Sequence, residues 1–181
     1  MSHGASKTGW NRKAVIETPR VVQTPAQLIA IIPITVARDK IQAVMGPGIQ
    51  ELAAHLKDQG IAPTGPWFTH HLRRPGDTYD FEICLPVARA VTASGRMAPS
   101  YMPAMTVAQT LYRGPYEGLG SAWGELMEWI NSNGHTRTSD LWEHYRVGPE
   151  SGHDAAHWQT ELIQPLTIPS PEDQEIPNRI D

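Results

Sequence analysis

The sequence predicts an α+β fold made of two strand-helix-strand-strand repeats, related by a pseudo-twofold axis, with antiparallel sheets and a central ligand groove. Two observations lead to this prediction. Residues 24–87 and residues 102–166 each begin with an apolar strand pattern, continue into an amphipathic helix pattern, and end in two strand patterns. The two halves also align on the glycines placed to end their helices, Gly60 and Gly134. The helices of such units cover one side of the sheets and leave a groove between the halves.

The opening strand and the helix of the two repeats correspond closely. The opening strands read TPAQLIAIIPITV and MPAMTVAQTLYRGPY. With the two glycines aligned, the apolar positions of the helices correspond as Ile49 with Trp123, Leu52 with Leu126, and Leu56 with Ile130. Pro47 fits an early position of the first helix, where its missing N–H leaves no hydrogen bond unmade.

A pair of strands follows each helix. The segments GPWFTHHL and DLWEHYRV align at Trp67 and Trp142, and the segments YDFEICLPV and WQTELIQPL align at Glu82 with Glu161 and Pro86 with Pro165. Turn-forming residues separate the two strands of each pair. This alignment sets Glu143 against Phe68 and Tyr145 against His70, which indicates either that the second repeat is specialised or that the two repeats have drifted apart.

The stretch from Asp140 to Pro149, DLWEHYRVGP, is expected to form a strand with an acid in its middle. Side chains alternate between the faces of a strand, so Glu143 and Tyr145 share one face with Leu141 and Val147. If that face is inward, the buried carboxylate needs a hydrogen-bonding or charged partner, which a cationic ligand would supply. If the face is outward, Glu143 is a solvated residue of an edge strand. The sequence leaves both interpretations open.

Composition limits the compartment and the partners. The 181-residue chain has a single cysteine, Cys84, so it forms no internal disulfide and we expect a reducing, cytoplasmic location. Cys84 lies in an apolar run and is expected to be a core residue. There is no secretory signal, and the longest apolar run, residues 28–36, is too short to span a bilayer, so no membrane contact is expected. A net charge of −4 and the lack of a basic stripe argue against a nucleic-acid surface.

The chain divides into three segments. Residues 1–16 are expected to form a flexible N-terminal segment, residues 17–168 the folded domain, and residues 169–181 a flexible acidic tail. The segment before the first expected strand is too short for a helix-turn-helix, so we expect no direct role as a transcription factor.

Four motifs occur in a fixed order along the folded part. They are Gly60…Gly65-Pro66 before an aromatic strand, Asp80-Phe81-Glu82-Ile83…Pro86-Val87, Arg113-Gly114-Pro115-Tyr116-Glu117-Gly118-Leu119 before the second helix, and Glu143-His144-Tyr145…Thr160-Glu161-Leu162…Pro165. This pattern resembles the GyrI-like small-molecule binding domain, which is also the effector-binding domain of AraC-type and MerR-type bacterial regulators. The resemblance covers residues 17–166. The chain departs from the family pattern at position 112, which is tyrosine where histidine is common.

The resemblance implies a stand-alone bacterial multidrug-binding module, acting as a sensor or by sequestering its ligands. Its pocket would bind hydrophobic, often cationic aromatic compounds, with Glu143 as the recurrent acid and Tyr145 two residues on. A similar branch of the family hydrolyses reactive cyclopropane-bearing compounds. A hydrolase with Glu143 as general base, assisted by Tyr145, is therefore an alternative. A gyrase-modulating interaction protein with an unknown partner is a further alternative, supported only by the acidic tail.

Aromatic side chains near Glu143 would supply flat apolar area and cation–π attraction, which reaches about 2 kcal/mol when desolvated. The predicted ligand-binding residues are Glu143, Tyr145, Tyr112, Trp67, Phe68, Trp142 and Glu161. Trp67 and Phe68 are neighbours on a strand, so only one of them is expected to reach a ligand. Trp123 and Trp129, on the second helix, are expected to be core residues.

We expect no metal and no cofactor. His70 and His71 are adjacent, and His153 and His157 lack the HExxH pattern and lie in a segment containing glycine and alanine. There is no glycine loop suited to phosphate and no GxSxG nucleophile motif.

Overall fold

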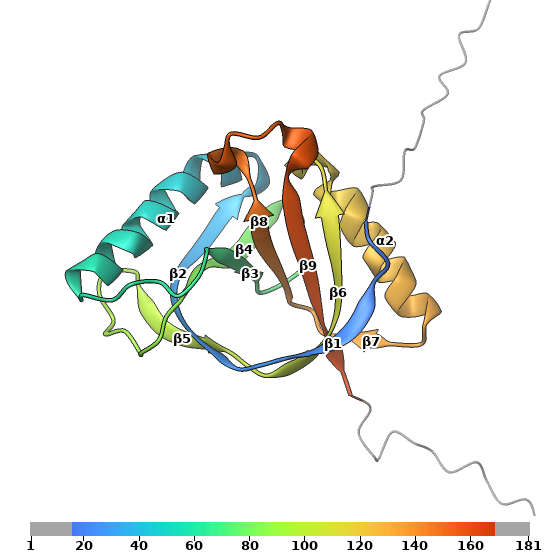
Figure 1. Cartoon of the computed structure of the whole chain (residues 1–181), viewed down its shortest axis with the longest axis horizontal. Coiled ribbons are helices and arrows are strands. Elements are labelled where there is room, and N and C mark those ends of the chain that lie inside the picture. The colour runs from blue at the N-terminus through green and yellow to red at the C-terminus, as the bar shows by residue number, and fades with distance from the viewer. Residues whose placement is uncertain (1–15, 169–181) are drawn as a thin grey trace, which may run out of the picture.

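The computed structural model describes residues 16–168 of the chain and shows a curled antiparallel sheet with two long helices (Figure 1). The expected flexible segments at residues 1–16 and 169–181 lie outside the described residues, apart from residue 16. The first repeat contains β1 (Arg20–Thr24), β2 (Gln27–Ala37), α1 (Ile41–Asp58), β3 (Phe68–His71) and β4 (Thr78–Pro86). The second contains β5 (Ala98–Met102), β6 (Met105–Arg113), α2 (Leu119–Ser132), β7 (Thr136–Arg137), β8 (Leu141–Val147) and β9 (Gln159–Thr167). The predicted α+β class and the two repeats are confirmed.

The strands join in the order β1-β6-β9-β8-β3-β4-β2-β5, with β7 paired to β9. Each neighbouring pair is antiparallel. The two repeats therefore meet at the β3–β8 pair in the middle of the sheet. The strand that carries Glu143 is a central strand rather than an edge strand.

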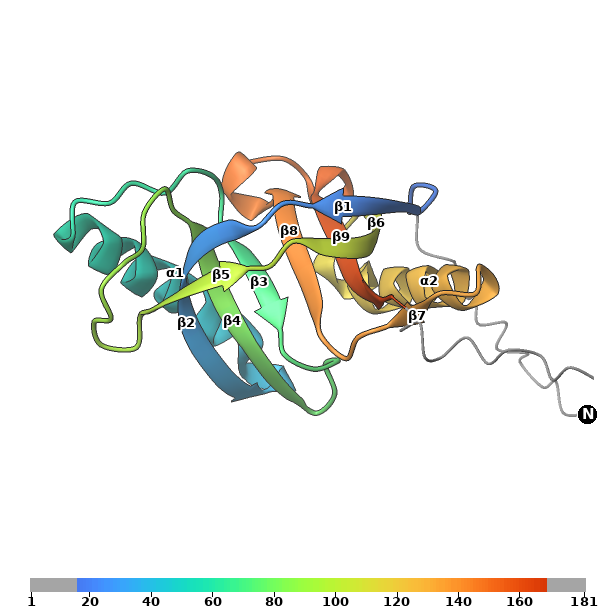
Figure 2. The ribbon, with the colours of Figure 1, turned by 90° about the horizontal axis from the view of Figure 1, so that it is seen from below.

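A proline-alanine pair interrupts the opening strand of each repeat. Pro25 and Ala26 separate β1 from β2, and Pro103 and Ala104 separate β5 from β6. The two parts of each interrupted strand pair with the other repeat, β1 with β6 and β5 with β2. Figure 2 shows these segments crossing the molecule side by side. This exchange ties the two halves together.

One face of the sheet can be followed from strand to strand through direct pairs. Thr69 of β3 pairs with Ile83 of β4 and with Glu143 of β8, and Glu143 pairs with Leu162 of β9. Directly paired residues point to the same face. Ile83 belongs to the core under α1 and Leu162 to the core under α2, so both helices cover this face. Thr69 and Glu143 lie between the two helices.

The opposite face has a core of its own. Cys84, Phe68 and Trp142 pack there with apolar residues of β2, β6 and β9. Cys84 is fully buried, and burial raises the pKa of its thiol well above the usual range. Both findings fit the expected core residue rather than a nucleophile.

The register corrects one detail of the repeat alignment. Matching Trp67 with Trp142 also matches Phe68 with Glu143, but these two residues lie on opposite faces of the sheet. Carrying the alignment of the helix-ending glycines into the strands instead matches Thr69 with Glu143 and His71 with Tyr145. The two tryptophans suggested an alignment that is one residue out of step, and one residue reverses the face.

Both helices end where the glycines predicted. Gly60 and Gly134 have φ values of 61° and 73°, a conformation that glycine adopts without strain. The start of α1 differs from the prediction, because α1 begins at Ile41 and Pro47 lies inside it. Pro47 has no N–H to donate, so the carbonyl of Ala43 lacks its helical partner.

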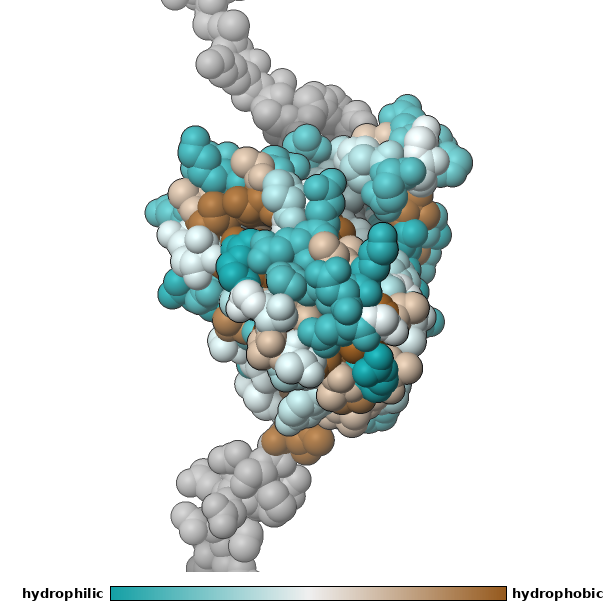
Figure 3. All heavy atoms as spheres, turned by 90° about the vertical axis from the view of Figure 1, so that its left-hand side faces the viewer, coloured by the Kyte–Doolittle hydropathy of each residue, from teal (hydrophilic) through white to brown (hydrophobic). Residues whose placement is uncertain are grey.

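The outer surface on the side of α1 is largely hydrophilic, with separate smaller apolar areas (Figure 3). No helix of residues 16–168 is long and apolar enough to cross a membrane.

Candidate functional site

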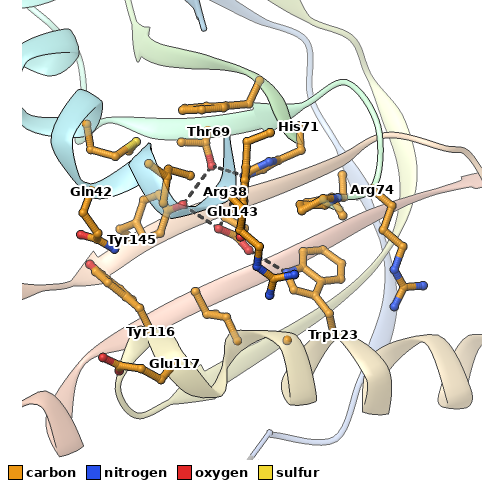
Figure 4. A pocket seen from close by; sticks show the side chains of 18 of the residues that line it. Arg38, Gln42, Thr69, His71, Arg74, Tyr116, Glu117, Trp123, Glu143 and Tyr145 are labelled. Atoms are coloured by element: carbon orange, nitrogen blue, oxygen red, sulfur yellow. Dashed lines mark hydrogen bonds and ion pairs between the residues drawn. The ribbon is translucent and has the colours of Figure 1, made fainter. Parts of the chain in front are cut away.

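A cavity of about 800 Å³ lies over the central Thr69–Glu143 pair, between α1 and α2 (Figure 4). Its size is in the range of small-molecule sites in proteins. The floor is formed by β3 and β8, and the walls by the N-terminal parts of the two helices. Ile49 of α1 and Trp123 of α2 both line it, and these residues are matched in the repeat alignment.

Glu143 is the buried acid of the cavity floor, with 8% of its surface exposed. The indole N–H of Trp123 donates to Oε1 at 2.7 Å, and the hydroxyl of Tyr145 donates to Oε2 at 2.6 Å. The Nε2 atom of His71 lies 3.8 Å from Oε2. No lysine or arginine of residues 16–168 forms an ion pair with this carboxylate.

The hydrogen bonds next to Glu143 form a chain with one consistent direction (Figure 4). A hydroxyl has a single hydrogen to donate. Because Tyr145 donates to Glu143, its oxygen accepts from the hydroxyl of Thr69 at 3.0 Å. Thr69 has then used its hydrogen, so it accepts from Nε2 of His71 at 3.3 Å. His71 therefore carries its proton on Nε2, and its buried Nδ1 has no partner among the described residues.

Burial keeps the two titratable donors of this chain, His71 and Tyr145, neutral. Burial lowers the pKa of His71, although the charge of Glu143 opposes this effect. Burial also raises the pKa of Tyr145 well above the usual range, and the neighbouring Glu143 adds to the effect. The cavity floor is thus a carboxylate supported by neutral donors.

Aromatic rings surround the carboxylate. Trp67 stacks on Tyr145 with ring centroids 4.5 Å apart, and Tyr116 meets Tyr145 edge-on at 5.8 Å. His71 lies against Phe81 at 5.3 Å. These rings offer flat apolar area to a ligand on more than one side.

Three of the predicted site residues line the cavity: Glu143, Tyr145 and Trp67. Phe68 and Trp142, which were also predicted, lie on the other face of the sheet with ring centroids 6.0 Å apart. Side chains alternate along a strand, so neighbours of cavity-facing residues must point away. As expected, only one of Trp67 and Phe68 reaches the cavity.

The other two predicted residues do not line the cavity. Tyr112 is buried under the start of α2, where its hydroxyl donates to the carbonyl of Pro115 at 2.9 Å. A Cβ atom at Gly118 would collide with this hydroxyl, so the tyrosine and the glycine fit together. Glu161 faces away from the cavity, where it accepts hydrogen bonds from Arg146 at 3.1 Å and from Gln109.

Sequence reasoning missed Trp123, Thr69 and His71. Trp123 was expected in the core, and it does pack there, but its indole also reaches Glu143. Its correspondence with Ile49 was a usable signal, because matched positions of two repeats occupy equivalent places beside the central groove. Thr69 and His71 would have followed from the alignment on the glycines.

A half-buried cluster of ionisable side chains lies on the face opposite the cavity. The ring of His70 bridges Glu82 at 3.0 Å and Asp140 at 2.9 Å, and it stacks on Trp142 at 3.8 Å. Although burial opposes protonation, the hydrogen bonds to Asp140 and Glu82 raise the pKa of His70. Within residues 16–168, no three histidine, cysteine, aspartate or glutamate side chains are grouped to hold a metal ion.

Comparison with solved structures shows the same fold in several proteins. The C-terminal domain of EcmrR is 25% identical with a TM-score of 0.74, over 83% of this chain and 97% of that domain. The match to EcmrR in a complex with DNA covers 82% of this chain and 57% of that chain, with 25% identity and a TM-score of 0.73. The chain thus spans little more than half the length of that EcmrR chain.

Two more distant structures share the fold alone. A hydrolase from Listeria innocua is 12% identical with a TM-score of 0.62, over 82% of this chain and 91% of that chain. SAV2435, solved with bound tetraphenylphosphonium, is 12% identical with a TM-score of 0.56, over 83% and 94% of the two chains. Curated protein sequences gave no match. The model of the GyrI-like small molecule binding domain matches residues 17–167, so the chain belongs to the GyrI-like family.

Proposed function

We propose that this domain binds hydrophobic aromatic small molecules, often cationic ones, in the cavity between α1 and α2, with Glu143 as the main polar anchor. One observation carries the proposal. A carboxylate that is 8% exposed forms the cavity floor and has two neutral donors but no cationic partner among the described residues. Burying such a charge is costly, and a bound cation would offset that cost.

The cavity walls support the same class of ligand. The stacked pair of Trp67 and Tyr145 presents ring faces beside the acid. A cation held over such rings gains about 0.5–2 kcal/mol, more when water is excluded. The domain would act as a sensor or by sequestering its ligands.

Ligand binding can be tested by quenching of tryptophan fluorescence, because Trp67 and Trp123 both line the cavity. Tetraphenylphosphonium, the cation bound to SAV2435, is a suitable probe. We expect saturable quenching by the wild-type protein. We expect Glu143→Gln to weaken binding by about 1–3 kcal/mol, the range for loss of a charged partner, or roughly fivefold to a hundredfold.

Glu161→Gln is a matched control. Glu161 is also 8% exposed, but it faces away from the cavity. This variant should bind the probe within about twofold of wild type, because the substitution changes a buried charge without touching the cavity. Equal weakening by both substitutions, or no weakening by Glu143→Gln, would refute the assignment.

Hydrolysis is a second candidate. The observation in its favour is the hydrogen-bond chain from His71 through Thr69 and Tyr145 to Glu143, which links the acid to a second proton-carrying group. Glu143 would then act as a general base on water. Mass analysis of a recovered cyclopropane-bearing compound separates the two functions. A hydrolase adds water to the compound and loses this activity in Glu143→Gln, whereas a binding protein returns it unchanged.

A role as a gyrase-modulating interaction protein, with an unknown partner, stays a prediction. The acidic tail at residues 169–181, on which it rested, lies outside the described residues.

A further inference from the structure

Basic side chains gather at one end of the cavity. Arg74 comes three residues after His71 of β3, and Arg137 comes four residues before Leu141 of β8. Because His71 pairs with Leu141 in an antiparallel arrangement, both arginines lie beyond the same end of the strand pair.

Arg38, just before α1, joins the other two. Its backbone N–H donates to the carbonyl of Asp77, in the turn that follows Arg74, at 2.9 Å. Figure 4 shows the side chain of Arg38 reaching over Glu143 and Trp123, and that of Arg74 beyond Trp123, on the side away from Tyr116 and Glu117. We call Arg38, Arg74 and Arg137 the basic end. None of the three forms an ion pair with another residue of the described part of the chain.

The opposite end of the cavity is acidic. Glu117 and Glu150 line it, beside Tyr116. Tyr116 contacts Tyr145, which lies toward the other end of β8 from Leu141. Burial, and then the negative charge of Glu150, raises the pKa of Tyr116 to about 12. We call Tyr116, Glu117 and Glu150 the acidic end.

The repeat shows that the fold does not impose this separation of charge. A short helical turn precedes the main helix in each half, at Arg38–Lys40 and at Tyr116–Gly118. The turn after the central strand carries Arg74 in the first repeat and Glu150 in the second. The first residue of the helical turn is thus Arg38 in one repeat and Tyr116 in the other, and the turn after the central strand carries arginine or glutamate. The second residue of the helical turn is acidic in both repeats, Asp39 and Glu117, so the charge separation rests on the arginines and on Glu150.

We propose that the cavity binds an amphoteric aromatic ligand in one fixed orientation, with an anionic group at the basic end. The inference rests on the proposed function and narrows its ligand class. The aromatic body lies over the Trp67–Tyr145 stack, and any cationic charge lies beside Glu143 and toward the acidic end. A guanidinium group presents a planar fork of donors that matches a carboxylate. Charges of opposite sign at the two ends also orient the ligand as it enters.

A matched pair of dyes tests the anionic group. One is a rhodamine with a free carboxylate, and the other is the methyl ester of the same dye. Both have the same cationic ring system. At physiological ionic strength, the wild-type protein should bind the free acid about fivefold more tightly than the ester, as expected for exposed ion pairs. Fluorescence polarisation reports both affinities.

The double substitution Arg38→Gln with Arg74→Gln should remove this preference, so that the free acid and the ester bind with affinities in a ratio of about one. The affinity for the cationic ester should not fall, because the substitution removes positive charge from the cavity lining. Arg73→Gln is the control, because Arg73 precedes Arg74, pairs with Asp80 at 3.6 Å, and does not line the cavity. It removes one positive charge next to Arg74 in the sequence and should keep the preference. The three substituted residues, Arg38, Arg73 and Arg74, are exposed, so the variants should fold. Circular dichroism checks this.

The possible failures can be told apart. If the ester binds as tightly as the free acid, or if Arg73→Gln removes the preference as effectively as the double variant, the anionic subsite is refuted and the proposed function stands. If neither dye binds the wild-type protein, both the subsite and the proposed function are refuted.

Discussion

The direction of the hydrogen-bond chain under the cavity makes the protonation site of His71 depend on Glu143. In the wild-type protein, Nε2 of His71 donates to Thr69, Thr69 to Tyr145, and Tyr145 to Glu143. Reversing the chain would remove the hydrogen between Tyr145 and the carboxylate. A hydrogen bond to a charged acceptor contributes about 1.5–3 kcal/mol. The Nε2–H tautomer should therefore dominate by roughly tenfold to a hundredfold.

The substitution Glu143→Gln should reverse the chain. The indole N–H of Trp123 can only donate, so it keeps the amide oxygen, and the amide nitrogen then faces Tyr145. Tyr145 must accept from this nitrogen and donate to Thr69, which in turn donates to Nε2 of His71. The proton of His71 moves to Nδ1.

Nitrogen NMR of the histidine rings reads this change directly, because protonated and unprotonated ring nitrogens resonate far apart. The His71 signal is assigned by its loss in His71→Gln. We expect Nε2–H in the wild type and in Glu161→Gln, and mainly Nδ1–H in Glu143→Gln. A wild-type protein with the proton on Nδ1, or a Glu143→Gln variant that keeps it on Nε2, would refute the derived direction.

Three other predictions concern stability and the separate roles of the two sheet faces. The raised pKa of His70 means that its contribution to stability is complete below the unfolded pKa of 6.5 and is lost as pH rises from there through the folded pKa. Urea unfolding should show a falling free energy of unfolding over this pH range, and His70→Asn should reduce the dependence on pH. Trp142→Ala should lower the free energy of unfolding by about 3–5 kcal/mol, because Trp142 is fully buried, whereas Trp67→Ala should mainly weaken ligand binding. The reverse pattern in thermal melts and titrations would contradict the assignment of the two faces. Gly118→Ala should lower the free energy of unfolding by about 1–3 kcal/mol, because the new Cβ meets the hydroxyl of Tyr112. In the double variant, Tyr112→Phe should restore part of this loss. If the losses of the two single variants simply add, the contact is excluded.

The sequence predicted which residues of β8 share a face, but it did not predict where β8 lies in the sheet. Alternation placed Glu143 and Tyr145 together, as the structure does. Whether that face was inward depended on the pairing of β8 with β3, which lies far away in sequence in the other repeat, as well as with the neighbouring β9. A pattern within one strand carries no information on such pairings.

The placement of Glu161 and of Trp123 also differs from the sequence-based prediction, for physical reasons that no local sequence pattern shows. Strand β9 is buried along most of its length, so its residues show no polar alternation from which the direction of Glu161 could be read. An amphipathic helix pattern shows which side of α2 is covered, but core and cavity lie on that same side. Trp123 could be placed beside Glu143 only once the gap between the two helices was known.

The proline inside α1 lies near the point where the helix passes from the cavity wall to the core. Ile41 and Met45, before Pro47, and Ile49, just after it, line the cavity and are only half-buried. Farther along the helix, Leu52 and Leu56 are fully buried in the core. The missing hydrogen bond at Pro47 makes it the natural bending point of the helix. Substitutions in the cavity-lining part can therefore reshape the wall for ligands of different size, while the anchored core part keeps the domain folded, so new specificities can evolve here at little risk to folding.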